Sequence, residues 1–231
     1  MKKPLFTFAI FLLVICNSYS FEYKYCRADT TYDMLSFYTL TKDTVLYRKT
    51  GKDIPVYEFY LERKNNTDEW DAIKSITIKD SATGKILQVL DSQKDSLFIV
   101  NMEFNDYNFD GYTDMYLYDA CAVLGNCFGK VFLFDPKKKI FVREKIFEEM
   151  TTVYIDDAKK EVYSFNQCCG GNESDSRIYR YINGKLTIQK QVSKTYSNIQ
   201  AKYIYTVKEF NNMGKVKTTK VIKSEDPELD L

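Results

Sequence analysis

The stretch DYNFDGYTD, residues 106–114, is the part of the sequence that says most about the fold. An apolar run at 97–104 leads into it, and the run MYLY at 115–118 leaves it. Short runs of this kind, rich in apolar and aromatic residues, are typical of strands. Gly111 stands where the loop has to turn sharply, which favours a residue that tolerates positive φ. The stretch therefore predicts a strand, a tight loop and a second strand.

Oxygen-bearing side chains occupy alternate positions of this loop, in the pattern D-x-N-x-D-G-x-x-D. A hard cation such as Ca²⁺ takes ligands of this type from a tight loop. The first nine positions match an EF-hand loop, but Leu117 stands at the twelfth, where that loop has a bidentate Glu. We therefore expect a β-loop-β calcium site, with a turn that keeps its shape without metal as the alternative. The expected ligands are the side chains of Asp106, Asn108, Asp110 and Asp114 and the backbone carbonyl of Tyr112.

The other segments read as strands separated by turns, and no repeat of fixed period is evident. Asn183-Gly184 is the signal of a type I′ hairpin, and only 147–150 suggests a short helix. We expect an all-β fold with antiparallel sheets, arranged as a sandwich or a propeller-like assembly. The expected strands are 44–49, 54–61, 73–79, 85–90, 97–104, 115–118, 130–135, 140–143, 161–165, 177–182, 185–192, 202–210 and 215–223.

The N-terminus has the pattern of an export signal. Lysines at 2–3 precede an apolar run at 5–15, and small residues lie just before the expected cleavage after Ser20. The apolar run is short for a transmembrane helix, and an uncleaved anchor is one alternative. Lipidation at Cys16 is another, although Ile15 is bulkier than the residue expected before a lipidated cysteine. We expect a periplasmic or secreted protein.

The mature chain has the composition of one folded domain. Cleavage removes two lysines and no acid, so the formal net charge falls from +1 to −1. This balance gives no reason to expect a nucleic acid or an anionic membrane as partner. The 19 Tyr and 16 Phe, with 9 Gly and 4 Pro, favour strands over disorder. We expect a single all-β domain at 21–223 and a flexible tail at 224–231.

Cysteine usage fits an oxidising compartment, where the five cysteines of the mature chain suggest two disulfides and one free thiol. Cys121 and Cys127 flank a short loop that contains glycine. Adjacent Cys168 and Cys169 are not expected to bridge each other, because a vicinal bridge strains the peptide. The sequence leaves the pairing open. The candidate disulfide residues are Cys26, Cys121, Cys127, Cys168 and Cys169.

The chain lacks the usual tools of catalysis. It has no histidine, which excludes a Ser-His-Asp arrangement and removes the usual zinc ligand. G-x-S-x-G, Walker and G-x-G-x-x-G motifs are also missing. The paired acids at 148–149 and 156–157 are sequence neighbours, and neighbours on a strand point to opposite faces. We therefore expect that the protein is not an enzyme.

Two polar, glycine-containing segments, 125–129 and 168–174, lie between strong strands. Disulfides would hold them on a rigid sheet, so they are natural contact surfaces, with stapled connectors that bind nothing as the alternative. Tyrosines at 179, 181, 203 and 205 could form a platform for a sugar or a protein. Cross-strand packing pairs are the alternative for these tyrosines.

Several segments, in their order along the chain, resemble one family. They are ITIKD (76–80), TGKILQ (83–88), FNDYNFDGYTD (104–114), FLFDP (132–136), FV (141–142), YRY (179–181) and NGKL (183–186). Over roughly residues 70–190 the chain resembles exported bacterial proteins with one D-x-N-x-D-G-x-x-D loop. Some of these are periplasmic immunity proteins against peptidoglycan hydrolases, similar to inhibitors of invertebrate-type lysozyme. The loop is the most specific part of the resemblance, although FG-GAP and dockerin repeats also contain such loops.

The resemblance implies an all-β, non-catalytic protein that binds a lytic enzyme and blocks its cleft. The metal positions carry over directly onto the five residues named above, whereas no inhibitory residue does. The chain departs from the family in its cysteine-rich loops and in its extension beyond about residue 195. The expected function is an exported binding protein with a structural Ca²⁺ that inhibits a peptidoglycan hydrolase or lysozyme-like enzyme. The alternative is a calcium-stabilised surface or carbohydrate-binding module, with a glycan as partner.

Overall fold

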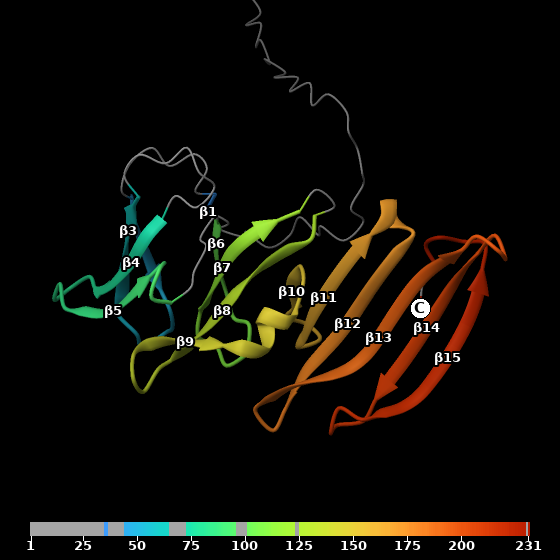
Figure 1. Cartoon of the computed structure of the whole chain (residues 1–231). Helices are drawn as coiled ribbons and strands as arrows, with labels where there is room; N and C mark the ends of the chain where they lie inside the picture. The colour runs from blue at the N-terminus through green and yellow to red at the C-terminus, as the bar shows by residue number, and fades with distance from the viewer. Residues whose placement is uncertain (1–34, 37–43, 65–72, 96–100, 123–124, 230) are drawn as a thin grey trace, which may run out of the picture. The chain divides into compact units, whose positions relative to one another are not determined.

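The computed structural model describes residues 35–36, 44–64, 73–95, 101–122, 125–229 and 231, and these residues form three antiparallel sheets (Figure 1). The predicted all-β fold class is confirmed. The export segment with Cys16, and Cys26 beyond it, lie outside the described residues. Within the described ranges, no helix is long and apolar enough to cross a membrane.

The first sheet is a meander in the order β2-β3-β4-β5. Alternate residues of β3 are buried, so one face of this sheet lies against a core and the other is open to solvent. The four strands agree with the predicted segments to within two residues at each end. Their bounds are Thr44–Lys49 (β2), Val56–Arg63 (β3), Ile73–Asp80 (β4) and Ile86–Asp91 (β5).

The second sheet has the order β1-β6-β7-β8-β9 and carries the loop at 106–114 between β6 and β7. A 3-10 helix, η2 (Lys145–Glu149), follows β9 and takes the place of the short helix expected at 147–150. The part of the expected strand 97–104 that precedes residue 101 lies outside the described residues. The strands are Leu35–Ser36 (β1), Asn101–Asn105 (β6), Asp114–Cys121 (β7), Cys127–Asp135 (β8) and Ile140–Glu144 (β9).

The third sheet runs in sequence order from β10 to β15, and Figure 1 shows its last five strands in orange to red. The predicted hairpin joins β12 to β13, where Asn183 and Gly184 both have positive φ, 51° and 75°, as a type I′ turn requires. The 3-10 helix η3 (Cys169–Gly171) links β11 to β12. The strands are Val153–Asp156 (β10), Glu161–Cys168 (β11), Glu173–Ile182 (β12), Lys185–Ser197 (β13), Lys202–Phe210 (β14) and Val216–Ser224 (β15).

The second sheet is buried on both faces. On β7, Met115 and Leu117 belong to a hydrophobic cluster that they share with the first sheet. Tyr116 and Tyr118 belong to a second cluster, which includes residues of β10 to β13. Because successive strand residues point to opposite faces, the run MYLY at 115–118 contributes to two cores at once. This double burial explains why the run has no polar position.

Gly129 on β8 allows this strand to lie close to β7. A Cβ atom at this position would lie 2.3 Å from the carbonyl oxygen of Leu117 and 2.5 Å from Cε2 of Tyr116. The first of these contacts is with backbone, which cannot move aside as a flexible side chain can. Gly84, by contrast, has open space around its Cβ position but a φ of +68°.

We predict that Gly129→Ala lowers the free energy of unfolding by about 3 kcal/mol, because the added methyl group overpacks the β7–β8 pair. Gly84→Ala should cost only about 1 kcal/mol, from the left-handed backbone alone. Urea unfolding of both variants measures the two losses. Equal losses would show that β7 and β8 are not packed this closely.

Candidate functional site

The loop between β6 and β7 alternates oxygen donors with aromatic anchors. Tyr107 is fully buried and Phe109 packs beside it, both against the cluster shared by the second and third sheets. Tyr112 packs against the other cluster, with its ring 5.8 Å from that of Phe134. The aromatic side chains therefore fix the loop to both cores. The intervening oxygen donors remain partly or fully exposed.

Side-chain oxygens hold the turn of this loop. The backbone N–H groups of Asp110 and Gly111 donate to the two carboxylate oxygens of Asp106, over 3.0 and 2.8 Å. The N–H of Asp110 also donates to Oδ1 of Asn108, and that of Tyr112 donates to Oδ1 of Asp110. Gly111 has a φ of +87°, as the sequence predicts. The predicted ligand positions thus already shape a tight loop.

Asp114 is completely buried at the first residue of β7. Its Oδ2 accepts the backbone N–H of Tyr107 and its Oδ1 accepts that of Phe134, each over 2.8 Å. The pKa of this carboxyl is raised to about 8, mainly by burial and in smaller part by the nearby carboxylates of Asp106 and Asp110. The two N–H donors oppose the rise. One side chain thus connects the start of the loop, β7 and β8.

The donor set of the loop suits a hard cation in kind, since it consists of carboxylate, amide and carbonyl oxygens. Within the described part of the chain, no Lys or Arg forms an ion pair with Asp106, Asp110 or Asp114. Burial raises the pKa of Asp106, and the charge of Asp110 adds to the rise, so the ionised form of Asp106 is disfavoured. A bound cation would stabilise this ionised form. The three carboxylates do not have ligand atoms within 4.8 Å of one another. Asp114 is completely buried, whereas Asp106, Asn108 and Asp110 are partly or fully exposed. Asp106, Asn108, Asp110 and the Tyr112 carbonyl are therefore the residues best placed to hold a cation.

The cysteines differ in state. Cys121 and Cys127 form a disulfide between paired positions of β7 and β8. Cys168 and Cys169 are exposed free thiols, so the described residues contain one of the two expected disulfides. No bridge joins Cys168 to Cys169, in agreement with the expectation for adjacent cysteines.

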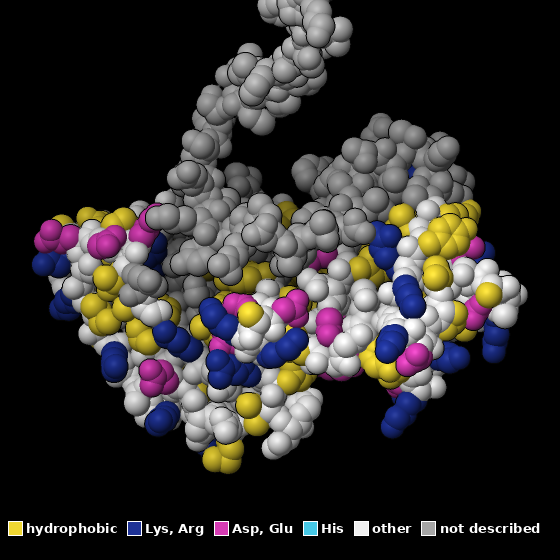
Figure 2. All heavy atoms as spheres, turned by 180° about the vertical axis from the view of Figure 1, so that it is seen from behind, with side chains coloured by type: hydrophobic (Ala, Val, Ile, Leu, Met, Phe, Trp, Pro, Cys, Tyr) yellow, Lys and Arg dark blue, Asp and Glu magenta, His cyan; other side chains and the backbone are white. Residues whose placement is uncertain are grey.

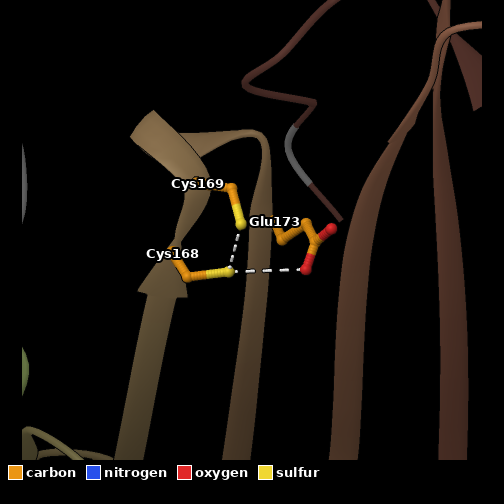
Figure 3. A group of neighbouring side chains, drawn as sticks. All are labelled: Cys168, Cys169 and Glu173. Atoms are coloured by element: carbon orange, nitrogen blue, oxygen red, sulfur yellow. Dashed lines mark hydrogen bonds between the residues drawn. The ribbon is translucent and has the colours of Figure 1, made fainter.

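Glu173 lies beside these thiols, and sequence analysis did not single it out as a site residue. Figure 3 shows its carboxylate and the two sulfur atoms turned toward one another. The sulfur atoms of Cys168 and Cys169 lie 2.9 Å apart, and Oε2 of Glu173 lies 3.4 Å from the Cys168 sulfur. Two thiolates and a carboxylate could hold a zinc-type ion. Hydrogen bonds to Cys169 and Glu173 raise the pKa of the Cys168 thiol to about 12, which disfavours the thiolate that a metal requires.

The two segments expected as contact surfaces lie side by side. The side-chain amide of Asn126 donates to the carbonyl of Gln167 over 2.6 Å and accepts the N–H of Gln167 over 3.0 Å. The first segment is also bonded to residue 152, which precedes β10, because the hydroxyl of Thr152 donates to the carbonyl of Gly125. Phe128 is 44% exposed beside the disulfide. We call residues 125–128 and 168–172 the contact edge.

The tyrosines do not form one open platform. Tyr179 and Tyr205 are buried, and Tyr181 and Tyr203 are partly exposed. Tyr179 and Tyr181 pack in or against the cluster between the second and third sheets. The ring of Tyr203 lies 4.9 Å from that of Tyr196 on the paired strand. Packing pairs therefore describe these residues better than a flat binding surface does.

Sequence analysis missed Glu103, a buried acid on β6. Its carboxylate accepts hydrogen bonds from the hydroxyls of Tyr107 and Tyr118, over 3.2 and 2.5 Å. Burial raises its pKa, and the two hydroxyl groups partly offset the rise. A single Glu in an alternating strand carries no sequence signal of this enclosure. The paired acids are on the surface by comparison, where Glu148 bonds Arg143.

We predict that Glu103→Gln gains stability relative to the wild type as the pH rises from about 4 to about 7. The raised pKa means that the folded state holds the proton more tightly than the unfolded chain does. This stabilising contribution is complete below the unfolded pKa of about 4.3 and is lost as the pH rises through the folded value. Glutamine has no proton to lose. Urea unfolding of both proteins across this range tests the effect, and a difference that does not change with pH would contradict it.

No family model matches this sequence, and no curated protein matches it. One solved structure is similar in fold, described as the structure of a Xanthomonas type IV secretion system related protein. The two chains align with a TM-score of 0.51 at 12% sequence identity, over 76% of this chain and 97% of that chain. At this identity the likeness concerns the fold alone. It shows that the arrangement of strands described above recurs in that structure, and it assigns no shared activity.

Proposed function

We propose that this protein is an exported, non-catalytic binding protein, stabilised by Ca²⁺, that inhibits a lysozyme-like peptidoglycan hydrolase. The contact edge is the surface that meets the hydrolase. The observation that carries the proposal is the pair of hydrogen bonds between Asn126 and Gln167, which joins the loop before β8 to the end of β11, next to residues 168–172, and so holds the two halves of the contact edge side by side.

Preorganisation is what an inhibitor of an enzyme cleft needs. A loop that is ordered before binding loses little conformational entropy on binding, so more of the contact energy appears as affinity. The Cys121–Cys127 disulfide and the bond from Thr152 to Gly125 hold one half of the edge. Phe128 offers an exposed aromatic side chain of the type that anchors interfaces.

Calcium has a structural role in this proposal. The loop at 106–114 is fixed to both hydrophobic clusters by Tyr107, Phe109 and Tyr112, so an ion bound there would stabilise the junction of the sheets. Acids without a protein counter-charge support a cation at this place. An ion bound there would supply only charge neutralisation and rigidity.

A catalytic role has less support. The chain has no histidine. Among the described residues, two buried acids have a raised pKa, but Glu103 is enclosed by two tyrosine hydroxyls and Asp114 accepts two backbone N–H groups. Carbohydrate binding through the tyrosines also has less support, because Tyr179 and Tyr205 are buried. The inhibitor is therefore the function that the residues favour.

We predict that the wild type melts several degrees higher in calcium than in EGTA. An ion that binds only the folded state at a hundredfold excess over its Kd contributes about 2.7 kcal/mol. Asp110→Ala should abolish the difference, since Asp110 is an exposed ligand whose loss leaves both cores intact. Asp157→Ala, at an exposed acid of the β10–β11 turn, is the matched control and should keep it. Equal melting temperatures in calcium and EGTA for the wild type would mean that the loop is a turn without metal.

We predict that the purified protein inhibits at least one lysozyme of the invertebrate, chicken or goose type at a near-equimolar ratio, measured by the clearing of a cell-wall suspension. Phe128→Ser should weaken inhibition at least tenfold. Asn126→Ala should weaken it as well, because the two halves of the contact edge are then no longer joined. Tyr47→Ser is the control, since Tyr47 is an exposed aromatic residue on β2, outside the contact edge. No inhibition of any of the three types would refute the proposal.

A further inference from the structure

The near-neutral net charge of the chain conceals a strong separation of charge. Residues 185–224, which form β13 to β15, contain nine lysines and one glutamate and carry +8. The whole chain carries +1, so everything outside this segment carries −7. Figure 2 shows Lys and Arg side chains standing among apolar ones on the side of the molecule that it displays. Such a segment attracts anionic groups, although the chain as a whole does not.

Strand register places a lysine and three tyrosines together on one face of this sheet. Lys194 on β13 is paired with Tyr205 on β14, and two residues along the strands Tyr196 is paired with Tyr203. Paired residues of antiparallel strands lie on the same face, as do residues two apart. The ammonium group of Lys194 lies 5.4 Å from the centre of the Tyr203 ring. We call Lys194, Tyr196, Tyr203 and Tyr205 the lysine–tyrosine face.

An acidic segment of the chain itself lies on this face. The sequence after β15 reads EDPEL, residues 225–229, and its contacts with β13 and β14 are specific. The ammonium group of Lys194 donates to the carbonyl of Pro227 over 3.2 Å. The hydroxyl of Tyr205 donates to the carbonyl of Asp226 over 2.8 Å and accepts the N–H of Leu229 over 3.4 Å.

The contacts indicate which kind of anion the face recognises. An ion pair joins Lys202 to Glu225 over 3.5 Å and uses the charge of the tail. The bonds from Lys194 and Tyr205 go instead to main-chain carbonyl groups, which a polypeptide has and a phosphate polymer lacks. A recognised ligand of this kind is an acidic peptide, and the tail that shows the contacts turns at 227–228, where the N–H of Glu228 donates to Oδ1 of Asp226.

We propose that the lysine–tyrosine face is a docking site for an acidic segment of a partner protein, and that residues 225–229 occupy it in cis as a competitor. This site adjoins the contact edge, because the hydroxyl of Tyr203 donates to Oδ1 of Asn172 over 3.4 Å and the N–H of Tyr196 donates to the Asn172 carbonyl over 3.1 Å. It requires neither calcium nor a hydrolase. A partner segment longer than the tail reaches two more lysines of the same face. Lys190 is four residues from Lys194 along β13, and Lys220 is two residues from Ile222, the partner of Tyr205 on β15.

The tail is displaceable because its ion pair is exposed. Lys202 and Glu225 are 45% and 81% exposed, and exposed pairs of this type contribute about 0.2–1 kcal/mol. A competitor that covers a site about 90% of the time lowers the apparent affinity for another ligand about tenfold. A partner segment therefore has to bind the face more tightly than the tail does, and a more acidic segment meets this requirement.

The test uses a fluorescent peptide of ten glutamates and measures its binding by anisotropy in low salt. The full-length protein is compared with a variant truncated after Ser224. We expect the truncated variant to bind about ten times more tightly, and added salt to weaken the binding of both. A peptide of ten glutamines should not bind. If truncation leaves the affinity unchanged or lowers it, the tail is not a competitor and the proposal fails.

Further variants, made in the truncated chain, locate the site. Lys194→Gln should lower the affinity at least threefold, and adding Tyr205→Phe should lower it further. Lys137→Gln with Lys138→Gln, in the charged turn between β8 and β9, removes more charge from a different sheet and should have no effect. Melting temperatures show whether each variant is folded, and Lys194→Gln alone suffices if the double variant is not. Equal losses from both sets, or equally tight binding of a ten-unit polyphosphate, would mean general anion attraction and overturn the proposal.

Discussion

The buried carboxylate of Asp114 is the interaction on which the centre of this protein depends. It satisfies the backbone N–H groups of Tyr107 and Phe134, which lie in the loop and on β8. A buried donor without an acceptor costs about 1–3 kcal/mol, so no apolar residue could take this position cheaply. Burial and the charges of Asp106 and Asp110 also disfavour the ionised form of Asp114 and raise its pKa. The fold therefore keeps an acid at its centre, close to two further acids with which no Lys or Arg of the described residues forms an ion pair.

The loop makes this arrangement possible by alternating two kinds of side chain. Tyr107 and Phe109 enter the cluster between the second and third sheets, and Tyr112 enters the other. The oxygen donors stand between these anchors. A loop that only bound metal would not need buried aromatic residues, and a loop that only packed would not need three acids. The pattern thus couples the position of the oxygen donors to the packing of the sheets.

Local signals in the sequence predicted much of the fold. Asn183-Gly184 predicted the β12–β13 hairpin and Gly111 predicted the turn of the loop, because each requires a backbone conformation that few residues adopt. The strand β10 was missed, since four residues are too few to display a period. The expected strand 185–192 ended five residues early, because the polar remainder of β13 lies on a sheet with little core behind it.

The candidate site was less predictable than the fold. The loop and its oxygen donors are contiguous in sequence, so spacing predicts them. The bonds between Asn126 and Gln167 join residues 41 positions apart, and the enclosure of Glu103 depends on Tyr118 of the neighbouring strand as well as on Tyr107 of the following loop. Net charge also misled, because lysines of β13 to β15 are offset by acids elsewhere in the chain. Averages over a chain do not report where charges lie.

The disulfide between Cys121 and Cys127 makes the rigidity of the contact edge depend on whether the compartment is oxidising. The bridge closes only a short loop at the ends of β7 and β8, whereas both hydrophobic clusters consist of apolar and aromatic side chains that hold without it. In the reducing cytosol the sheets would form without this bridge, and the contact edge would keep only the hydrogen bonds of Asn126 and Thr152. Under the proposed function, oxidation after export would make the binding surface more rigid, so a precursor delayed inside the cell would be folded but would bind its partner more weakly.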